Sequence, residues 1–401
     1  MHITKVLQNY LKESVADIHQ KRLSCLLQTS ATLLSRAKLT LTSLGHHRQG
    51  QAHVKHKIKA VDRLLKNNHL YAERIKIYQA IAAKLIGHLK MIDIIIDWSP
   101  VSNRTYYILR ASLVFEQRSI TLYEEVHPEE KLGNYVVHKS FLTTLRQIIP
   151  SYTKPVIITD SGFRTEWFEL VLSQGWDFEG RVCNNMQYLL DNHGTWKKTK
   201  VLKPVKMNKA TYIGKVLLTK VRQLPCEMYA YLGKRKNNTI SHSVRKKGRK
   251  RNSPRANRRY RNQHTQPWIL VTSIQYKNKL DAKAIVKRYA RRMKIEHEFR
   301  TTKNAKWGLG LNQTLTCGKL RLEILLLIGT IAMLYLWLIG LASERRNLQY
   351  HYQVNTIKTR RVLSILFLGL QVIEHQPNLI TFPELNTVLR HTQFEEENTY
   401  F

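Results

Sequence analysis

The sequence predicts a mixed α/β fold that is preceded by a helical region. Two short runs of β-branched residues, at positions 93–97 and 155–160, are separated by further strand-like segments and a helical one. The first 88 residues contain few glycines and carry apolar residues at roughly helical intervals. Strands, then a helix, then another strand are typical of a mixed sheet covered by helices.

Length and charge limit the class of protein. A chain of 401 residues can bury at least one large core and contain two or three structural units. Its 66 Lys and Arg residues outnumber 28 Asp and Glu residues, which gives a formal net charge of +38. This surplus is unlike the balance of a metabolic enzyme and favours a polyanionic partner, usually nucleic acid, although an anionic lipid surface attracts the same charge.

The cysteines and the N-terminus indicate a reducing compartment. The four cysteines show no Cys-x-x-Cys spacing, so neither a structural zinc site nor a disulfide framework is expected. The first ten residues include no apolar run of the kind found in a secretory signal. A cytoplasmic protein fits both observations.

An amphipathic helix is expected over residues 52–66, after a loop at 46–51. Its apolar side chains form one stripe, and the basic ones lie mainly elsewhere: Lys55, Lys59, Arg63 and Lys66. The loop followed by this helix is compatible with a helix-turn-helix arrangement that contacts DNA. A basic helix that is merely solvated is the alternative.

Two apolar runs end in aspartate, at Asp97 and at Asp160. Between them, residues 105–115 and 118–126 are expected to form strands and residues 139–149 a helix, and another helix is expected at 167–174. A carboxylate that closes an apolar strand is exposed at the end of a sheet, and neighbouring strands lie under about 5 Å apart, so two such groups can share a metal ion. Either aspartate could instead cap a turn.

Residues 180–265 are less regular and partly β, which we interpret as an insertion. Within it, residues 234–261 hold 13 Lys or Arg and no acid. We expect phosphate contacts from the densest part of this run, although a solvated loop is the alternative: Lys246, Lys247, Arg249, Lys250 and Arg251.

A strand is expected at residues 268–272, and one long helix at 281–302. At 100° per residue, four polar side chains of this helix share one face about 60° wide, whereas Glu298 lies on the far side: Tyr289, Arg292, Glu296 and Lys303. Such a stripe suits a site where the glutamate binds metal and the other three hold phosphates. An exposed stripe with an Arg–Glu pair is the alternative.

The segment 324–341 contains 18 residues without a charge. This length is sufficient for a membrane span, and a helix buried inside a large core has the same composition. The surrounding chain is polar, which favours the buried helix.

At this point the sequence resembles a known family. Asp97 in Ile-Ile-Asp-Trp-Ser, Asp160 in Ile-Thr-Asp-Ser-Gly-Phe, and the spaced residues Tyr289, Arg292, Glu296 and Lys303 are similar to motifs of the DDE transposases of bacterial cut-and-paste insertion sequences. The likeness is to the branch with a Tyr-Arg-Glu-Lys signature and extends over nearly the whole chain. It implies an RNase H-like mixed sheet with a β-rich insertion, preceded by a helical DNA-binding region.

The resemblance also implies roles for the site residues. Asp97, Asp160 and Glu296 would be the catalytic carboxylates and would bind two Mg²⁺ ions, for which Mn²⁺ would substitute. Trp268 matches the tryptophan that stacks on a base flipped from a DNA hairpin, and a tryptophan in the core is the alternative. Expected partners are double-stranded DNA, at terminal inverted repeats and at the target, and a second copy of the chain in a synaptic homodimer. No membrane is expected, and the protein would associate with the bacterial nucleoid.

The expected domains follow from this comparison. Residues 1–88 would form a helical DNA-end-binding region. Residues 89–179 and 266–345 would form the two parts of an RNase H-like catalytic domain, residues 180–265 the β-rich insertion between them, and residues 346–401 a C-terminal helical region.

Three other functions compete with a transposase. A DNA-binding protein without catalysis would not need carboxylates at two strands and on a helix. A nuclease that cuts without joining would share the carboxylates but would not need a base-stacking Trp268. A single-span membrane protein would use the segment 324–341 and leave the motifs unexplained.

Overall fold

The computed structural model describes residues 15, 17–101, 105–190, 194–202, 206–233, 267–275 and 279–397. The chain divides into two compact units, residues 1–156 with 293–401 and residues 157–292, and each is described by itself. The five basic residues expected to contact DNA between 246 and 251 lie outside the described residues.

Four helices form the described N-terminal part of the first unit and confirm the helical prediction there: α2 (Gln20–Leu34), α3 (Leu41–His46), α4 (Val54–Leu65) and α5 (Asn68–Ile86). Side chains cap the starts of three of them: His19 accepts the Lys21 amide of α2, Thr40 the Ser43 amide of α3 and Asn67 the Leu70 amide of α5. Helix α4 buries Val61, and its basic side chains face solvent.

An antiparallel sheet in the first unit contains β1 (Met91–Pro100), β2 (Tyr106–Val114) and β3 (Ser119–Pro128), in the order β3-β2-β1. The prediction that Asp97 closes its strand is wrong. Strand β1 continues to Pro100, because Trp98, Ser99 and Pro100 pair with residues of β2. Burial changes at Asp97 all the same: residues 92–96 are buried, whereas Asp97 is half-buried.

Helices α6 (Tyr135–Ile148) and α10 (Met293–Lys303) lie on opposite faces of β1. Trp98 Nε1 donates to His138 Nε2 of α6 at 3.2 Å, and Lys303 Nζ of α10 donates to Ser99 Oγ at 2.7 Å. Successive residues of a strand point to opposite faces. Asp97, two residues from Ser99, is therefore on the α10 side.

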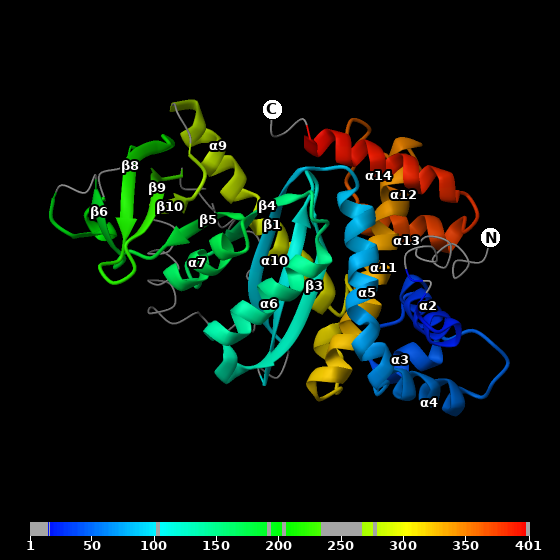
Figure 1. The fold of residues 1–401 in the computed structure, drawn as a ribbon. Coiled ribbons are helices and arrows are strands. Elements are labelled where there is room, and N and C mark those ends of the chain that lie inside the picture. Colours follow the sequence, from blue (N-terminus) through cyan, green and yellow to red (C-terminus); the bar gives the residue numbers. More distant parts are fainter. Residues whose placement is uncertain are drawn as a thin grey trace, which may run out of the picture. The chain divides into compact units, whose positions relative to one another are not determined.

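Helix α11 (Lys319–Arg345) is the core of the first unit. Its neighbours include α2, α5, α13 (Ile365–His375) and α14 (Phe382–Glu397), all of which contact it (Figure 1). It is long and apolar enough by composition to cross a membrane, yet its apolar window is completely buried within the structure. The expectation of a buried core helix is confirmed in this respect. A Cβ atom on Gly340 would lie 2.0 Å from the Ile365 carbonyl oxygen of α13, so the two helices meet closely.

The second unit is built on antiparallel strands with the order β5-β10-β9-β8-β6-β7: β5 (Asp177–Val182), β6 (Gln187–Leu190), β7 (Lys197–Lys198), β8 (Thr211–Leu218), β9 (Leu224–Tyr231) and β10 (Trp268–Thr272). Helices α7 (Thr165–Ser173) and α9 (Lys279–Ala290) contact β5. The strand predicted at 268–272 and the partly β character of the described part of 180–265 are confirmed.

Shorter elements complete the chain. Strand β4 (Lys154–Thr159) contains the point at which the second unit begins, and Asp160 directly follows it, as predicted. The remaining short helices are η2 (Glu129–Lys131), η3 (Thr199–Val201), η4 (Leu311–Gln313) and α12 (Gln349–Tyr352).

The single helix predicted over residues 281–302 is wrong, because α9 ends at Ala290 and α10 begins at Met293. The amides of Arg291 and Arg292 donate to carbonyls three residues earlier, both at 3.0 Å. Lys287 and Arg288 precede these two arginines by four residues, and like charges at that spacing disfavour a continuous helix. The expected four-residue face is therefore broken up: Tyr289 lies in α9, Glu296 and Lys303 lie in α10, and Arg292 lies in the turn between them.

Candidate active site

Asp97 is a half-buried carboxylate in the middle of β1. Its Oδ1 accepts the N–H of Trp98 at 2.8 Å, and its backbone partner on β2 is Arg110. Helix α10 contacts β1 and carries Glu296, also half-buried, in its first turn. A negative charge is favourable at that end of a helix. The first unit thus holds two of the three expected carboxylates on contacting elements.

Lys303 ends α10 next to this part of β1. Its ammonium donates to Ser99 Oγ at 2.7 Å and to the Pro100 carbonyl. The pKa of Lys303 is lowered to about 8, chiefly by burial and also by the charge of Arg110, while the carboxylate of Asp97 acts in the opposite direction. Lys303 is therefore a cation near Asp97 that loses its proton under mildly alkaline conditions.

Asp160 lies in the second unit, directly after β4. Its Oδ1 accepts the N–H of Gly162 at 2.8 Å, which is the turn-capping contact considered for a strand-end aspartate. A Cβ atom on Gly162 would lie 3.0 Å from this oxygen. In the described part of the chain, Asp160 Oδ2 accepts no hydrogen bond. The cap therefore accounts for only one of its two oxygens.

Three more expected site residues gather near Asp160 in the second unit. Tyr289 is 4 % exposed, and its ring centroid lies 5.1 Å from that of Trp268, edge to face. The pKa of Tyr289 is raised to about 12, chiefly by burial, which outweighs the lowering by the charges of Arg292 and Arg181; the charge of Asp160 acts in the same direction as burial. Asp160, Trp268, Tyr289 and Arg292 thus share one region of this unit.

Trp268 is half-buried at the start of β10. Its ring also lies 5.8 Å from that of Tyr231 on the paired strand β9. The indole therefore has aromatic neighbours on a strand and on a helix, and part of its surface remains accessible.

Buried charges that no sequence motif indicates hold α10 against the sheet. Arg110 and Glu124 form an ion pair at 2.6 Å, and Arg110 lies 3.8 Å from Glu298 of α10. All three are at most 1 % exposed. Glu298 also accepts hydrogen bonds from Ser119, at 2.6 Å, and from Thr121. Breaking such a pair leaves a buried charge uncompensated, so these contacts fix the helix that carries Glu296 and Lys303.

Helix α4 presents a cationic face. Lys55, Lys59 and Arg63 follow one another at intervals of four residues and are all exposed. None of these three has an ion-pair partner among the described residues, whereas Lys66 pairs with Asp62 at 3.1 Å. This spacing places one cation on each successive turn of the same side of the helix.

Carboxylate oxygens are the ligands that hard divalent cations prefer. Within the described residues, no group of three or more His, Cys, Asp and Glu side chains is placed to hold a metal ion. Asp97 and Glu296 belong to the first unit and Asp160 to the second. All three are half-buried, so each combines reduced solvation with access from solvent, and as oxygen donors they fit a divalent cation.

Comparison with protein families gives one match. Residues 89–335, more than half of the chain, match the family model described as the transposase DDE domain. No curated protein matches the chain. The matched region begins just before β1 and ends within α11, so it contains Asp97, Asp160 and Glu296.

Proposed function

Because the chain belongs to the DDE transposase family, we propose that it performs cut-and-paste transposition with Asp97, Asp160 and Glu296 as catalytic carboxylates. As a transposase of an insertion sequence it binds DNA and has nuclease and strand-transfer activity. The proposed sequence of steps is nicking at the ends of the element, hairpin formation, hairpin resolution and strand transfer into target DNA.

One observation carries this assignment. The residues selected from the sequence fall into two groups, and each group contains one of the two aspartates. Asp97 is accompanied by Lys303 and by the helix of Glu296, and Asp160 by Tyr289, Arg292 and Trp268. Scattered surface residues would not sort in this way.

The cofactor we propose is Mg²⁺, two ions per site, with Mn²⁺ as a substitute. Transposases of this family generally use divalent ions, and the three carboxylates would hold them. When bound, such ions stabilise the negative charge that develops on a phosphate during strand cleavage.

The other side chains would position the DNA. Arg292 can hold a phosphate through two parallel N–H donors. Tyr289, with a pKa of about 12, keeps its proton at neutral pH and can only act as a neutral hydrogen-bond partner, not as a base. Lys303 contributes a positive charge beside Asp97 below pH 8. Trp268 would stack on a base flipped from the hairpin.

The proposal also includes the expected fold, family branch, DNA contacts, assembly and location of the protein. The fold would be RNase H-like, and the branch would be the one with the Tyr-Arg-Glu-Lys signature, with the strongest likeness to the transposase of the tetracycline-resistance composite transposon. The basic face of α4 and the basic residues between 246 and 251 would bind the terminal inverted repeats. Two copies would assemble on paired DNA ends, in the bacterial cytoplasm in association with the nucleoid.

A cleavage assay tests the assignment. A labelled duplex that carries the end of the element is incubated with Mg²⁺ or with EDTA, for wild type, Asp97→Asn, Asp160→Asn and Glu296→Gln. We expect metal-dependent nicking and then a hairpin in wild type only, while all variants bind the end with similar affinity. Glu130→Gln removes an exposed carboxylate elsewhere in the first unit and serves as the control that still nicks.

Three outcomes would change the assignment. Nicking by Glu296→Gln at the wild-type rate would remove that residue from the site. Binding without any nicking by wild type would favour a DNA-binding protein without catalysis. Hairpin formation by Trp268→Ala at the wild-type rate would favour a nuclease that cuts without joining.

A further inference from the structure

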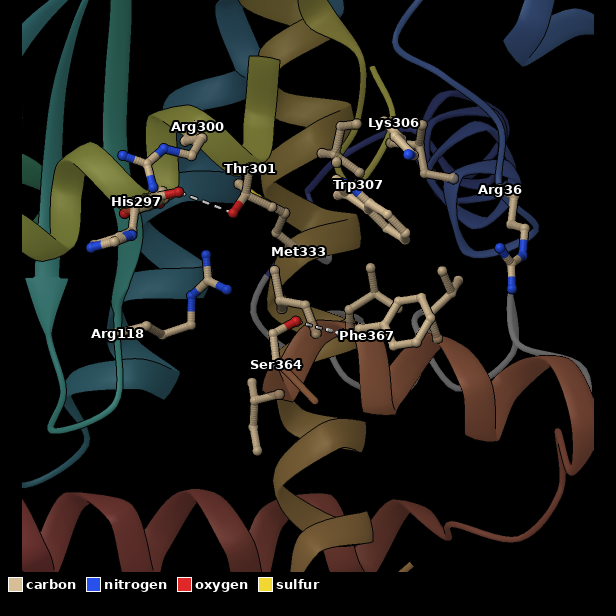
Figure 2. A pocket seen from close by; sticks show the side chains of 18 of the residues that line it. Arg36, Arg118, His297, Arg300, Thr301, Lys306, Trp307, Met333, Ser364 and Phe367 are labelled. Carbon is tan, nitrogen blue, oxygen red and sulfur yellow. Dashed lines mark hydrogen bonds between the residues drawn. The ribbon is translucent and has the colours of Figure 1, made fainter. Parts of the chain in front are cut away.

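A pocket of about 660 Å³ lies in the first unit beside α10 (Figure 2), and Glu296 does not line it. Counted at 100° per residue, three residues of α10 that line this pocket lie about 100° to 160° around the helix from Glu296: Lys294, His297 and Thr301. Arg300 also lines it and lies about 40° from Glu296, so it is at the edge of the pocket nearest that residue. The other walls come from the α2–α3 connection, the β2–β3 turn, the segment after α10, α11 and α13. The proposed catalytic residues do not line it.

The rim of the pocket is cationic. Seven Lys or Arg residues line it together with a single acid, Glu298: Arg36, Lys38, Arg118, Lys294, Arg300, Lys306 and Arg361. Two are paired with acids outside the pocket, Arg36 with Glu374 and Arg361 with Glu344. Arg300 and Lys306 have no acidic partner in the described part of the chain. Their charge is available to a ligand.

Trp307 stands at the mouth of the pocket and is 70 % exposed. Hydrogen bonds define the segment that carries it: Asn304 Oδ1 accepts the N–H groups of Lys306 and Trp307, each at 2.8 Å, and the Leu309 amide donates to the Thr301 carbonyl at 2.9 Å. This hydrogen-bonded turn therefore holds the indole of Trp307 in its exposed position.

The surroundings of the indole are aromatic, cationic and apolar. Its ring lies 6.4 Å from that of Phe367, edge to face, and Lys306 Nζ lies 5.0 Å from its centroid. Figure 2 shows Trp307 pointing toward Phe367, with Met333 deeper in the pocket and Arg300 on the opposite wall. Met333 and Leu336 are only 3 % and 5 % exposed, so the floor is apolar.

These features match the chemistry of a nucleotide. A planar base stacks on an exposed aromatic ring, and Arg and Lys side chains hold its phosphate. The volume lies within the range of about 300 to 1,000 Å³ that small-ligand pockets have. An acidic peptide would use the cations but leave the exposed indole without a partner.

We propose that this pocket binds one unpaired nucleotide of a DNA strand, with the base against Trp307 and the phosphate on Arg300 and Lys306. A base inside a duplex is covered by its neighbours, so only an unpaired or extruded one can enter. Arg300 follows Glu296 by four residues, which places the bound phosphate about one helical turn from the proposed catalytic glutamate. The proposal rests on DNA binding by the family and not on cleavage.

The test compares two duplexes of the same sequence, one fully paired and one with a single extrahelical thymidine, by fluorescence anisotropy with the full chain in EDTA. We expect wild type to bind the bulged duplex at least about 5-fold more tightly, the lower limit that stacking of one base supports. Trp307→Ala and Arg300→Gln should lose this preference and keep the affinity for the paired duplex. Because no cleavage is measured, failure here is distinct from failure of the nicking assay.

Two matched controls should keep the preference. Leu315→Ala removes an apolar side chain that is 94 % exposed and does not line the pocket. Arg390→Gln removes an exposed arginine of α14 in the same unit. Thermal unfolding shows whether a variant is folded, and Lys306→Gln replaces any that is not.

Cross-linking and competition identify the site and the source of the nucleotide. A 5-iododeoxyuridine at the bulge, after irradiation, should cross-link to the peptide that contains Trp307. Cross-links confined to Trp268, or an equal preference for the bulge in Trp307→Ala, would overturn the proposal. Loss of the preference at micromolar free thymidine monophosphate would also overturn it, because the pocket would then serve a free nucleotide.

Discussion

The affinity of the protein for its DNA end should depend on the protonation of Lys303. This side chain ends α10 beside Asp97, and burial lowers its pKa from an ordinary value of 10.5 to about 8. The perturbation is a change of pH from 7 to 9, applied to wild type and to Lys303→Arg, whose guanidinium stays charged throughout.

The size of the effect follows from the pKa. Lys303 carries its charge in about 90 % of molecules at pH 7 and in about 10 % at pH 9. If only the charged form holds the phosphate, the affinity falls about 10-fold over this range, and binding at pH 9 takes up a proton. The stability of the free protein changes in the opposite direction. Between pH 8 and 10.5 the unfolded lysine binds more protons than the folded one, so this group favours folding more as the pH rises.

Anisotropy titrations of a labelled end duplex in EDTA measure the affinity at each pH. Wild type should show the fall, and Lys303→Arg should show a nearly flat profile between pH 7 and 9. Lys303→Met should bind more weakly at pH 7 and vary little with pH. A wild-type profile that parallels that of Lys303→Arg would refute the reasoning, because another group would then carry the pH dependence.

The remaining expectations concern the core and the N-terminal helices. Gly340→Ala should lower the free energy of unfolding by more than about 2 kcal/mol, because its Cβ would lie 2.0 Å from a backbone oxygen of α13. Gly329→Ala, on the same helix, meets only the ends of leucine side chains, the nearer at 3.1 Å, so its effect should stay within about 1 kcal/mol. Equal values for the two variants by chemical denaturation would contradict the close helix contact. Replacing Lys55, Lys59 and Arg63 together by glutamine should reduce the slope of log affinity against log salt concentration by about 2.7. An unchanged slope in titrations at several salt concentrations would exclude α4 as a DNA contact.

Elements with a strong local signal could be predicted from the sequence. The strand 268–272 has a compact β-branched and aromatic composition, and the structure forms a strand over the same residues. The uncharged run 324–341 lies within α11, and its burial follows from the polar chain around it. In both cases the composition of neighbouring residues was sufficient for the prediction.

Features that depend on distant parts of the chain could not be predicted. Strand β1 continues past Asp97 because β2 offers partners as far as Tyr107, opposite Pro100. The buried ion pair of Arg110 and Glu124 joins two strands, and no spacing in the sequence distinguishes these charges from exposed ones. The break between α9 and α10 could not be predicted, because the helical periodicity of the sequence is the same on both sides of it.

The candidate site shows the same division. The carboxylates could be selected from their settings and from family motifs, and the edge-to-face contact of Trp268 with Tyr289 required coordinates. The pocket beside Trp307 is lined by segments between residues 33 and 370, so no local motif indicates it.

The enclosure of α11 has a consequence for the synthesis of the protein. Its apolar window has a mean hydropathy of 2.5, the composition of a membrane span, and two of the helices that cover it, α13 and α14, are made after it. In a nascent chain that ends before residue 365, α13 and α14 are not yet present to bury the apolar surface of α11. This exposed apolar segment favours membrane insertion or aggregation. Once α13 and α14 have been synthesised and pack on α11, this segment becomes part of the buried core of a DNA-binding enzyme.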